Sequence, residues 1–463
     1  MTGNESFHRF VARFPDARRA PFFGRRHFSR RRFFELLGSG VTASYLAGPL
    51  RADAVVKEQP VTTRNTARSV IFVLLAGAPS HIDTFDFKEV AGVTPTAFAP
   101  ETAGGIVWPA GLMPRLKDQL ADLAIVRSMR SWALQHNLSQ TWAQIARSPA
   151  AALGDVAPNV GSVVALEKAN ERRPTDVFPA FLALNSNSAV GSGYLSAAYS
   201  PYKVTPSTAG LPNTTNRDGA ARFAQKWDLM SALDAPLRAG SPLGKEVEDY
   251  DAFYQAARGL MYNPAVDETF RYSAADAQRY GSSAFGNACL VAAKVVAADR
   301  GTRFIQITLG GWDHHQNIYA AANLPRLAKM LDDGLSALLA DLKAGGLLNE
   351  TLIVVMGEFG RTVGRLSAQN GRDHYLQQFA VFAGAGVRGG RAIGSTDERG
   401  SATLDPGWSR GRDIRPEDVE ATIYSALGIN WTRTRYDDPF GRGFEYIPYA
   451  SEDLYGPVEE LWG

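Results

Sequence analysis

Histidine and acidic residues recur near the ends of predicted strands in this chain of 463 residues. Five of its 7 histidines lie beyond residue 54, and they are His81, His136, His314, His315 and His374. Four of the five come after a predicted strand, and His136 comes shortly after another. Ligands of open α/β sheets bind in the crevice beyond the carboxyl ends of the strands, so these side chains are expected to meet there.

Acidic partners lie in the same short segments. Asp83 follows the first strand, Asp313 precedes His314 and His315, and Glu358 follows a later strand. Carboxylates with neutral imidazoles suit a divalent metal ion such as Zn²⁺, Mn²⁺ or Fe, whereas a single cysteine excludes a thiolate site. Taken singly, each group has a simpler interpretation, because Asp83 can cap a helix and a lone histidine is usually packed or solvated. Taken jointly, at least three of them are expected to share one site.

Polar groups that can hold a substrate stand beside these candidates. Arg361, a catalytic candidate, and Arg372, a candidate for substrate binding, lie near Glu358 and His374, where a guanidinium can bind an anion through two parallel hydrogen bonds. The alternative for both arginines is an ordinary surface ion pair. Ser80, in the turn after the first strand, is a further candidate for substrate binding.

The elements that must position these groups alternate along the chain. Short apolar, β-branched runs predict strands at residues 69–76, 123–127, 180–184, 303–309, 351–357 and 378–383. Helical periodicity is found at residues 113–121, 140–146, 160–169, 284–298, 324–342 and 416–427. This alternation predicts an α/β fold with a mostly parallel central sheet covered on both faces. Residues 190–270 break the rhythm and are interpreted as an insertion or cap on a domain that spans residues 55–463.

The first 54 residues resemble an export signal. Ser29-Arg30-Arg31-Arg32-Phe33-Phe34 matches the twin-arginine pattern, an apolar stretch follows, and Ala52-Asp53-Ala54 offers a cleavage site. The alternative is a basic amphipathic helix. The signal predicts the twin-arginine translocase as a partner, a periplasmic or extracellular location and no permanent membrane span. Because residues 1–54 hold 10 of the 49 Lys and Arg but 4 of the 47 Asp and Glu, the remainder is slightly acidic, which gives no reason to expect nucleic acid.

Four motifs in order resemble a known family. They are Gly77-Ala78-Pro79-Ser80-His81-Ile82-Asp83, Gly311-Trp312-Asp313-His314-His315, Gly357-Glu358-Phe359-Gly360-Arg361 and Gly371-Arg372-Asp373-His374. Together they are similar to the exported family called domain of unknown function 1501, over about residues 65–445. That family is grouped with alkaline phosphatases, sulfatases and cofactor-independent phosphoglycerate mutases. The resemblance implies a three-layer α/β/α domain with one or two divalent metal ions at the strand ends.

The resemblance also assigns roles to residues of this chain. Asp83 corresponds to an aspartate that binds one metal ion, and Asp313, His315 and His374 correspond to the ligands of the other. Glu358 stands where relatives have an Asp-His pair, which removes one possible ligand. A site with a single metal ion is therefore the alternative to one with two. His314 stands where the family often has Thr, which favours an exposed or supporting role.

The main departure from the superfamily concerns its nucleophile. His136 falls where relatives have a nucleophilic Ser, Thr or modified Cys, and an imidazole there can bind metal or accept a phosphoryl group. Ser139 and Thr141 are alternative nucleophiles, and the sulfatase signature around a cysteine is absent. The favoured function is hydrolysis of a phosphate or sulfate ester, on a small molecule or carbohydrate, by water that the metal activates. The alternative is a non-catalytic exported binding or assembly protein that retains the fold and a structural metal, and an isomerase or transferase is the least favoured.

Overall fold

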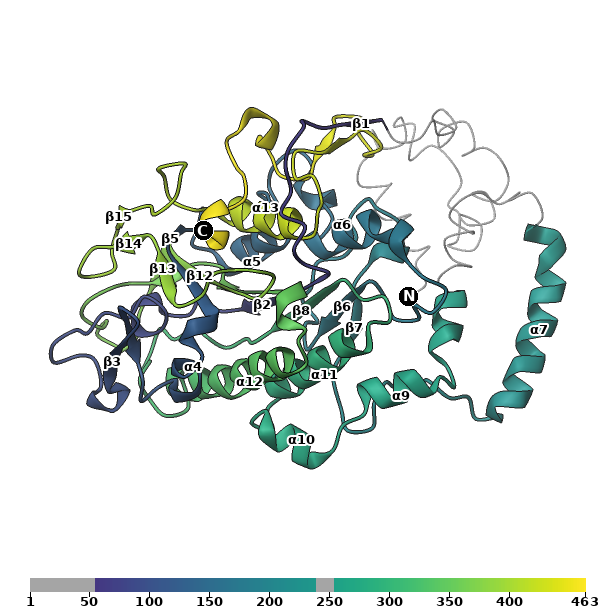
Figure 1. Cartoon of the computed structure of the whole chain (residues 1–463), viewed down its shortest axis with the longest axis horizontal. Coiled ribbons are helices and arrows are strands. Elements are labelled where there is room, and N and C mark those ends of the chain that lie inside the picture. Colours follow the sequence, from purple (N-terminus) through teal and green to yellow (C-terminus); the bar gives the residue numbers. More distant parts are fainter. Residues whose placement is uncertain (1–54, 239–253) are drawn as a thin grey trace, which may run out of the picture. The chain divides into compact units, whose positions relative to one another are not determined.

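Three strands buried along their whole length form the middle of the central sheet. They are β2 (Ser69–Leu75), β9 (Thr351–Gly357) and β12 (Gln377–Ala383). No residue of these strands faces solvent, which is why their sequences read as continuous apolar runs rather than alternating ones. The computed structural model that shows this describes residues 55–238 and 254–463 (Figure 1). The twin-arginine motif at residues 29–34 lies outside the described residues.

Eight strands make up this sheet, in the order β13-β5-β12-β9-β2-β8-β6-β7. The five not yet given are β5 (Leu123–Arg130), β6 (Phe181–Leu184), β7 (Tyr202–Val204), β8 (Phe304–Thr308) and β13 (Arg391–Ile393). Every neighbouring pair is parallel except those of β12, which runs antiparallel to both β5 and β9. The predicted mostly parallel sheet is therefore confirmed. Because β12 is reversed, the residues that precede it reach the edge at which the other strands end.

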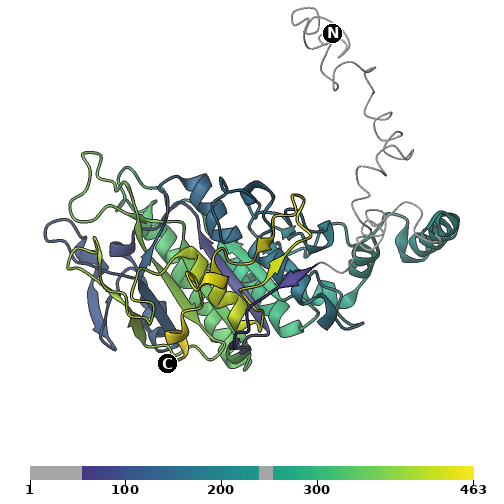
Figure 2. The ribbon, with the colours of Figure 1, turned by 90° about the horizontal axis from the view of Figure 1, so that it is seen from above.

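Helices cover both faces of the sheet. The helices of the described residues include α4 (Pro114–Lys117), α5 (His136–Ile145), α6 (Val160–Glu167), α7 (Gly219–Arg238), α9 (Pro264–Phe270), α10 (Ala274–Arg279), α11 (Ala284–Ala298), α12 (Leu324–Ala344) and α13 (Pro416–Ala426), and those that cover the sheet do not include α7. In β2, Ile71 and Val73 pack into one core with α11 and α12, whereas Val70 and Phe72 pack into another with α5, α6 and α13. Side chains of a strand alternate between its faces, so the two cores define three layers (Figure 1). Figure 2 looks onto the layer that contains α13.

The remaining strands form small sheets. These are β1 (Val56–Lys57) with β16 (Thr434–Arg435) and β17 (Phe444–Glu445), β3 (Pro100–Ala103) with β4 (Ile106–Pro109), β10 (Gly360–Arg361) with β11 (His374–Tyr375), and β14 (Ser395–Thr396) with β15 (Thr403–Asp405). The pairing of β10 with β11 bears on function, because it sets Arg361 opposite His374.

Beyond shifts of one to three residues at the ends of several elements, three differences between the predicted and the observed elements matter here. Helix α5 begins at His136, four residues before the predicted start, so this histidine occupies the first helical position. The helix predicted over residues 113–121 is only the short α4, followed by a separate turn of 3-10 helix at Leu120–Asp122. Part of the predicted insertion belongs to the main sheet, because β7 pairs in parallel with β6 at its edge. Among the described residues, no helix is both long and apolar enough to span a bilayer.

Candidate metal centre

Four side chains from separate parts of the chain meet at one edge of the sheet. His136 opens α5 after β5, Asp313 and His315 follow β8, and His374 lies in β11 just before the reversed strand β12. One nitrogen or oxygen of each residue lies within 4.8 Å of those of the other three. These four residues, which we call the metal group, were all among the metal or catalytic candidates of the sequence.

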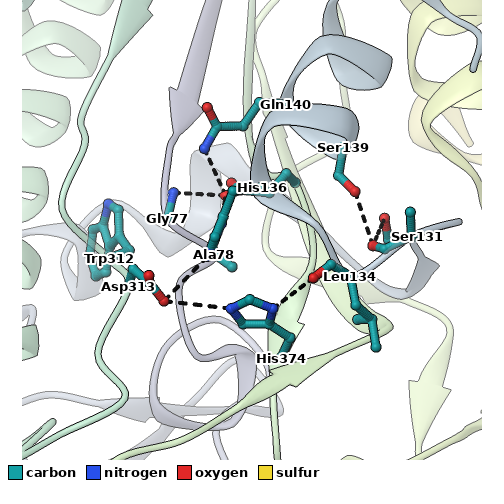
Figure 3. Close-up of polar contacts among 12 residues, drawn as sticks. Gly77, Ala78, Ser131, Leu134, His136, Ser139, Gln140, Trp312, Asp313 and His374 are labelled. Carbon is teal, nitrogen blue, oxygen red and sulfur yellow. Dashed lines mark hydrogen bonds and ion pairs between the residues drawn. The ribbon is translucent and has the colours of Figure 1, made fainter. Parts of the chain in front are cut away.

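The Oδ1 atom of Asp313 lies near the Nε2 atoms of all three imidazoles. It is 3.3 Å from His136 Nε2, 3.0 Å from His315 Nε2 and 3.6 Å from His374 Nε2. The Nε2 atoms of His315 and His374 are only 3.0 Å apart. Figure 3 shows the His374 ring directed at Asp313.

The other ring nitrogen of each histidine is bonded to an acceptor outside the group. His136 Nδ1 lies 2.7 Å from Glu358 Oε1, His315 Nδ1 2.8 Å from Asp373 Oδ1, and His374 Nδ1 2.7 Å from the Leu134 carbonyl oxygen. A carbonyl or carboxylate oxygen only accepts, so in the neutral rings Nδ1 carries the proton and Nε2 presents its lone pair. Partners of this kind orient the histidine ligands of metal ions. Asp373 was not among the candidate residues of the sequence, although its place beside His374 was visible.

This arrangement fits a divalent cation. Two Nε2 lone pairs 3.0 Å apart repel each other unless a proton or a cation lies between them. In a tetrahedral zinc site with Zn–N bonds of about 2.0–2.1 Å, ligand atoms are about 3.3 Å apart. The carboxylates of Asp313, Glu358 and Asp373 outnumber the one guanidinium, that of Arg361, by two formal charges. An ion of charge +2 would balance that excess.

Solvent can reach the metal group. The side chains of His136 and His374 are 24% exposed, that of His315 41% and that of Asp313 45%. Burial lowers the pKa of His374, which keeps this imidazole neutral, whereas the hydrogen bond to Glu358 raises the pKa of His136. The centre is thus open on one side, as catalytic sites require.

Arg361 holds Asp313 from the buried side. Its guanidinium is inaccessible and donates to the carbonyl oxygens of Ala78 (2.8 Å), Arg372 (3.1 Å) and Gly77 (2.5 Å), as well as to Asp313 Oδ1 (2.6 Å). Burial alone would raise the pKa of Asp313, but the Arg361 hydrogen bond and charge outweigh it and lower that pKa to about 2. Arg361, predicted as a catalytic residue, therefore holds the Asp313 carboxylate in place and keeps it ionised.

Glu358 lies outside the metal group and is bonded to one of its members, His136. Its Oε1 atom is bonded to His136 Nδ1 and accepts hydrogen bonds from the Gly77 backbone N–H (2.8 Å) and from Gln140 Nε2 (2.9 Å) (Figure 3). Its Oε2 atom is buried and has no hydrogen-bond partner among the described residues. Predicted as a metal ligand, Glu358 is therefore found bonded to a member of the metal group rather than within that group itself.

Asp83, Ser80 and Arg372 form a second buried cluster that the structure does not bring into the metal group. Asp83 Oδ2 accepts hydrogen bonds from Ser80 Oγ (2.6 Å) and Arg372 Nε (2.8 Å), and Oδ1 accepts one from the Tyr319 hydroxyl (2.8 Å). The side chains of Asp83 and Arg372 are 0% exposed. In this conformation the Asp83 carboxylate is occupied by these partners, and neither Ser80 nor Arg372 faces solvent.

The hydroxyl groups of the alternative nucleophiles, Ser139 and Thr141, are also hydrogen-bonded. Ser139 Oγ donates to the Ala133 carbonyl oxygen (3.0 Å), and Thr141 Oγ1 donates to that of Asn137 (2.8 Å). His314 lies outside the metal group, and burial lowers its pKa to about 4, so its ring is neutral.

Gly77 permits the close approach of two segments at the centre. Its φ is +107°, and a Cβ atom there would lie 2.7 Å from the backbone nitrogen of Trp312 and 2.8 Å from that of Asp313. Contacts this short cannot form without moving the segment that carries Asp313. Gly92 offers a matched comparison, because its φ of +72° is also positive but a Cβ there would meet nothing within 4 Å.

We expect Gly77→Ala to destabilise the protein more than Gly92→Ala. A positive φ costs an alanine about 1–2 kcal/mol at either site, and overpacking adds about 1–3 kcal/mol at Gly77 alone. Urea unfolding of both variants, with the wild type alongside, measures the difference. Equal losses of unfolding free energy would show that Gly77 is needed for its backbone angle only.

Comparison with known proteins gives the following similarities. The PsFucS1 sulfatase from Pseudoalteromonas sp. is 15% identical, with 78% of this chain and 68% of that chain covered and a TM-score of 0.37. The lipoteichoic acid synthase LtaP from Listeria monocytogenes is 11% identical, with coverage of 85% and 79% and a TM-score of 0.36. The C-terminal periplasmic domain of EcEptC from Escherichia coli, in complex with Zn, is 10% identical, with coverage of 82% and 87% and a TM-score of 0.37. At these TM-scores, the chemistry must be inferred from the side chains of this chain.

Among curated proteins, none matches the chain. The resemblance predicted from the four motifs is nevertheless confirmed at the level of the family. The family described as "Protein of unknown function (DUF1501)" matches residues 67–446, more than half of the chain, and the chain therefore belongs to it.

Proposed function

We propose that the protein is a metal-dependent hydrolase of phosphate or sulfate esters, with a divalent cation bound by the metal group. The observation that supports this is the convergence of three imidazole Nε2 atoms and one carboxylate oxygen within 4.8 Å. Each imidazole is held by an outer acceptor at Nδ1, which directs its Nε2 atom at the other members of the metal group. The Nε2 atom of His315 also lies 3.5 Å from Arg361 Nη1, a contact that an ion would replace. Donors of this kind suit Zn²⁺, Mn²⁺ or Fe.

The residues of the chain hold and orient the reacting groups. The four donors bind the ion, while Glu358, Asp373 and the Leu134 carbonyl keep the imidazole protons on Nδ1. A cation bound there would polarise the ester oxygen and lower the pKa of a water molecule. Water is favoured as the nucleophile, since the Ser139 and Thr141 hydroxyls are bonded to backbone carbonyls.

The class of substrate rests on the grouping of the family that the four motifs resemble with alkaline phosphatases and sulfatases. A phosphate or sulfate ester carries the negative charge that a cation attracts, and the exposed side of the metal group admits it. The ester group of a small molecule or carbohydrate is the form of substrate we propose, with residues 190–270 contributing to its selection. Export through the twin-arginine translocase to the periplasm or cell exterior is part of the same proposal.

A panel of chromogenic phosphate monoesters, phosphate diesters and sulfate esters tests the activity of the Zn²⁺-loaded protein. We expect one class to be hydrolysed, and His374→Ala to lower kcat/KM by about 100-fold through loss of one ligand. His314→Ala is the matched control, because His314 precedes His315 but lies outside the metal group. If the protein binds Zn²⁺ but hydrolyses no ester, and His374→Ala changes stability alone, the enzyme proposal is wrong.

That outcome would support the second candidate, an exported binding or assembly protein with a structural metal. One observation favours it. The guanidinium groups of Arg361 and Arg372 are buried and bonded to carboxylates and backbone carbonyls, so neither is free to bind a substrate anion.

A further inference from the structure

A buried carboxylate on α13 accepts hydrogen bonds from two tryptophans. Glu417, the second residue of α13, is 3% exposed. The indole N–H of Trp132 lies 3.1 Å from its Oε1 and 3.0 Å from its Oε2, and the indole N–H of Trp142 lies 2.8 Å from Oε1. An indole nitrogen can only donate, so both tryptophans depend on this one acceptor. Hydrogen bonds to an ionised carboxylate are the stronger kind.

The two tryptophans flank, along the chain, the segment that contributes His136 to the metal group. Trp132 lies two residues before Leu134, whose carbonyl oxygen accepts the Nδ1 proton of His374. Trp142 lies in α5, the helix that His136 begins. The two indole rings are also stacked, with centroids 6.2 Å apart. A shift of either tryptophan would therefore move a ligand or the group that orients one.

Arg415 fastens the same loop to the start of α13. Its guanidinium carbon lies 3.9 Å from the centre of the Trp132 ring, a cation–π contact. Its Nη1 donates to the carbonyl oxygens of Arg130 (3.2 Å) and Ser131 (3.0 Å). Helix α13 also contacts α5 directly. The beginning of α13 is thus bonded to the loop before His136 and to the helix after it.

We propose that Glu417 is a positioning residue for the metal centre, acting through Trp132 and Trp142 on His136 and on the Leu134 carbonyl. This inference rests on the proposed metal site. Sequence reasoning recognised α13 as a helix but assigned no role to Glu417, since nothing in the chain indicates that it faces tryptophans 285 and 275 residues away.

Glu417→Gln tests this role with little change of volume. Glutamine keeps one acceptor oxygen and replaces the other with an NH₂ donor. With the oxygen at the place of Oε1, the NH₂ group takes the place of Oε2 and sets a donor against the indole N–H of Trp132, and the negative charge that strengthens both indole hydrogen bonds is lost. In the purified full-length protein, we expect the affinity for Zn²⁺, measured by competition with a chromophoric chelator, to fall about 10-fold. Burial raises the pKa of Glu417 to about 7, so the titration is run at pH 8, where the carboxylate is ionised.

Glu420→Gln is the matched control. Glu420 lies on the same helix and is 1% exposed, but neither of its carboxylate oxygens has a hydrogen-bond partner among the described residues. We expect this variant to bind Zn²⁺ within about twofold of the wild type, whatever its Tm, because it leaves the indole hydrogen bonds intact. The visible absorption of the Co²⁺-loaded protein should likewise change in Glu417→Gln and not in Glu420→Gln.

The outcomes separate this inference from the proposal on which it rests. If Glu417→Gln lowers the Tm but leaves Zn²⁺ affinity and the Co²⁺ spectrum unchanged, Glu417 serves only the core and the inference is wrong. If the wild type itself binds no Zn²⁺, the metal site fails, and this inference with it. Should Glu417→Gln not fold, Trp142→Phe removes one indole donor while keeping a ring. A lowered Zn²⁺ affinity in that variant supports the inference, and an unchanged one overturns it.

Discussion

Asp313→Asn is expected to lower the affinity for Zn²⁺ by about 10²–10³-fold and to remove measurable ester hydrolysis. Structural zinc sites bind with about 10–16 kcal/mol, or about 3–4 kcal/mol for each of four ligands, and 1.4 kcal/mol corresponds to about a factor of ten. Asp313 is the only anionic donor of the metal group, and its pKa of about 2 keeps it charged throughout the usable pH range. Isothermal titration with Zn²⁺ measures the loss directly.

Two further aspartates make this a graded test. Asp373 bonds His315 Nδ1 rather than the ion, so Asp373→Asn is expected to cost about 10–100-fold in affinity. Asp155 is an exposed aspartate outside the metal group, and Asp155→Asn should bind Zn²⁺ as the wild type does. Equal affinities in all three variants would mean that Asp313 binds no ion.

Removal of the metal ion is expected to abolish hydrolysis and to lower the Tm. When the ion is removed, the Nε2 atoms of His315 and His374, 3.0 Å apart, must take up a proton or separate. An ion present at a thousand times its Kd stabilises the folded state by about 4 kcal/mol. Differential scanning calorimetry before and after dialysis against a chelator measures this difference.

The ions that restore the Tm and the activity show whether nitrogen or oxygen atoms bind the metal. Zn²⁺ should recover both Tm and activity, whereas Ca²⁺ should recover neither, because Ca²⁺ takes oxygen ligands and three of the four donors are nitrogens. A Tm that does not respond to chelation or to added Zn²⁺ would contradict a metal site at His136, Asp313, His315 and His374.

Much of the fold was predictable from local pattern. The runs that predict β9 and α11 have the bounds found in the structure, because β9 is a short apolar and β-branched run and α11 is a long one interrupted only by Asn287 and Lys294 on one face. The start of α5 was missed, since His136, Asn137 and Leu138 form no apolar period.

The direction of β12 could not be predicted from the local sequence pattern. Its residues are buried in the same way as those of parallel β2 and β9, so its sequence does not reveal that it runs the other way. That reversal brings His374, which lies directly before β12, to the edge where β5 and β8 end. The site was expected there because acidic and imidazole groups cluster near strand ends, but the route taken by His374 was decided by the sheet.

The sequence by itself determined which residues are candidates to bind a cation, which segments form the buried strands, and to which family the chain belongs. The tertiary structure alone decided which charges pair. It bonds Asp83 to Arg372, 289 residues away, and Glu358 to His136, 222 residues away. The physical reason is that apolar periodicity acts over a few neighbouring residues, whereas a hydrogen bond between distant side chains forms only once the strands have taken their order and direction.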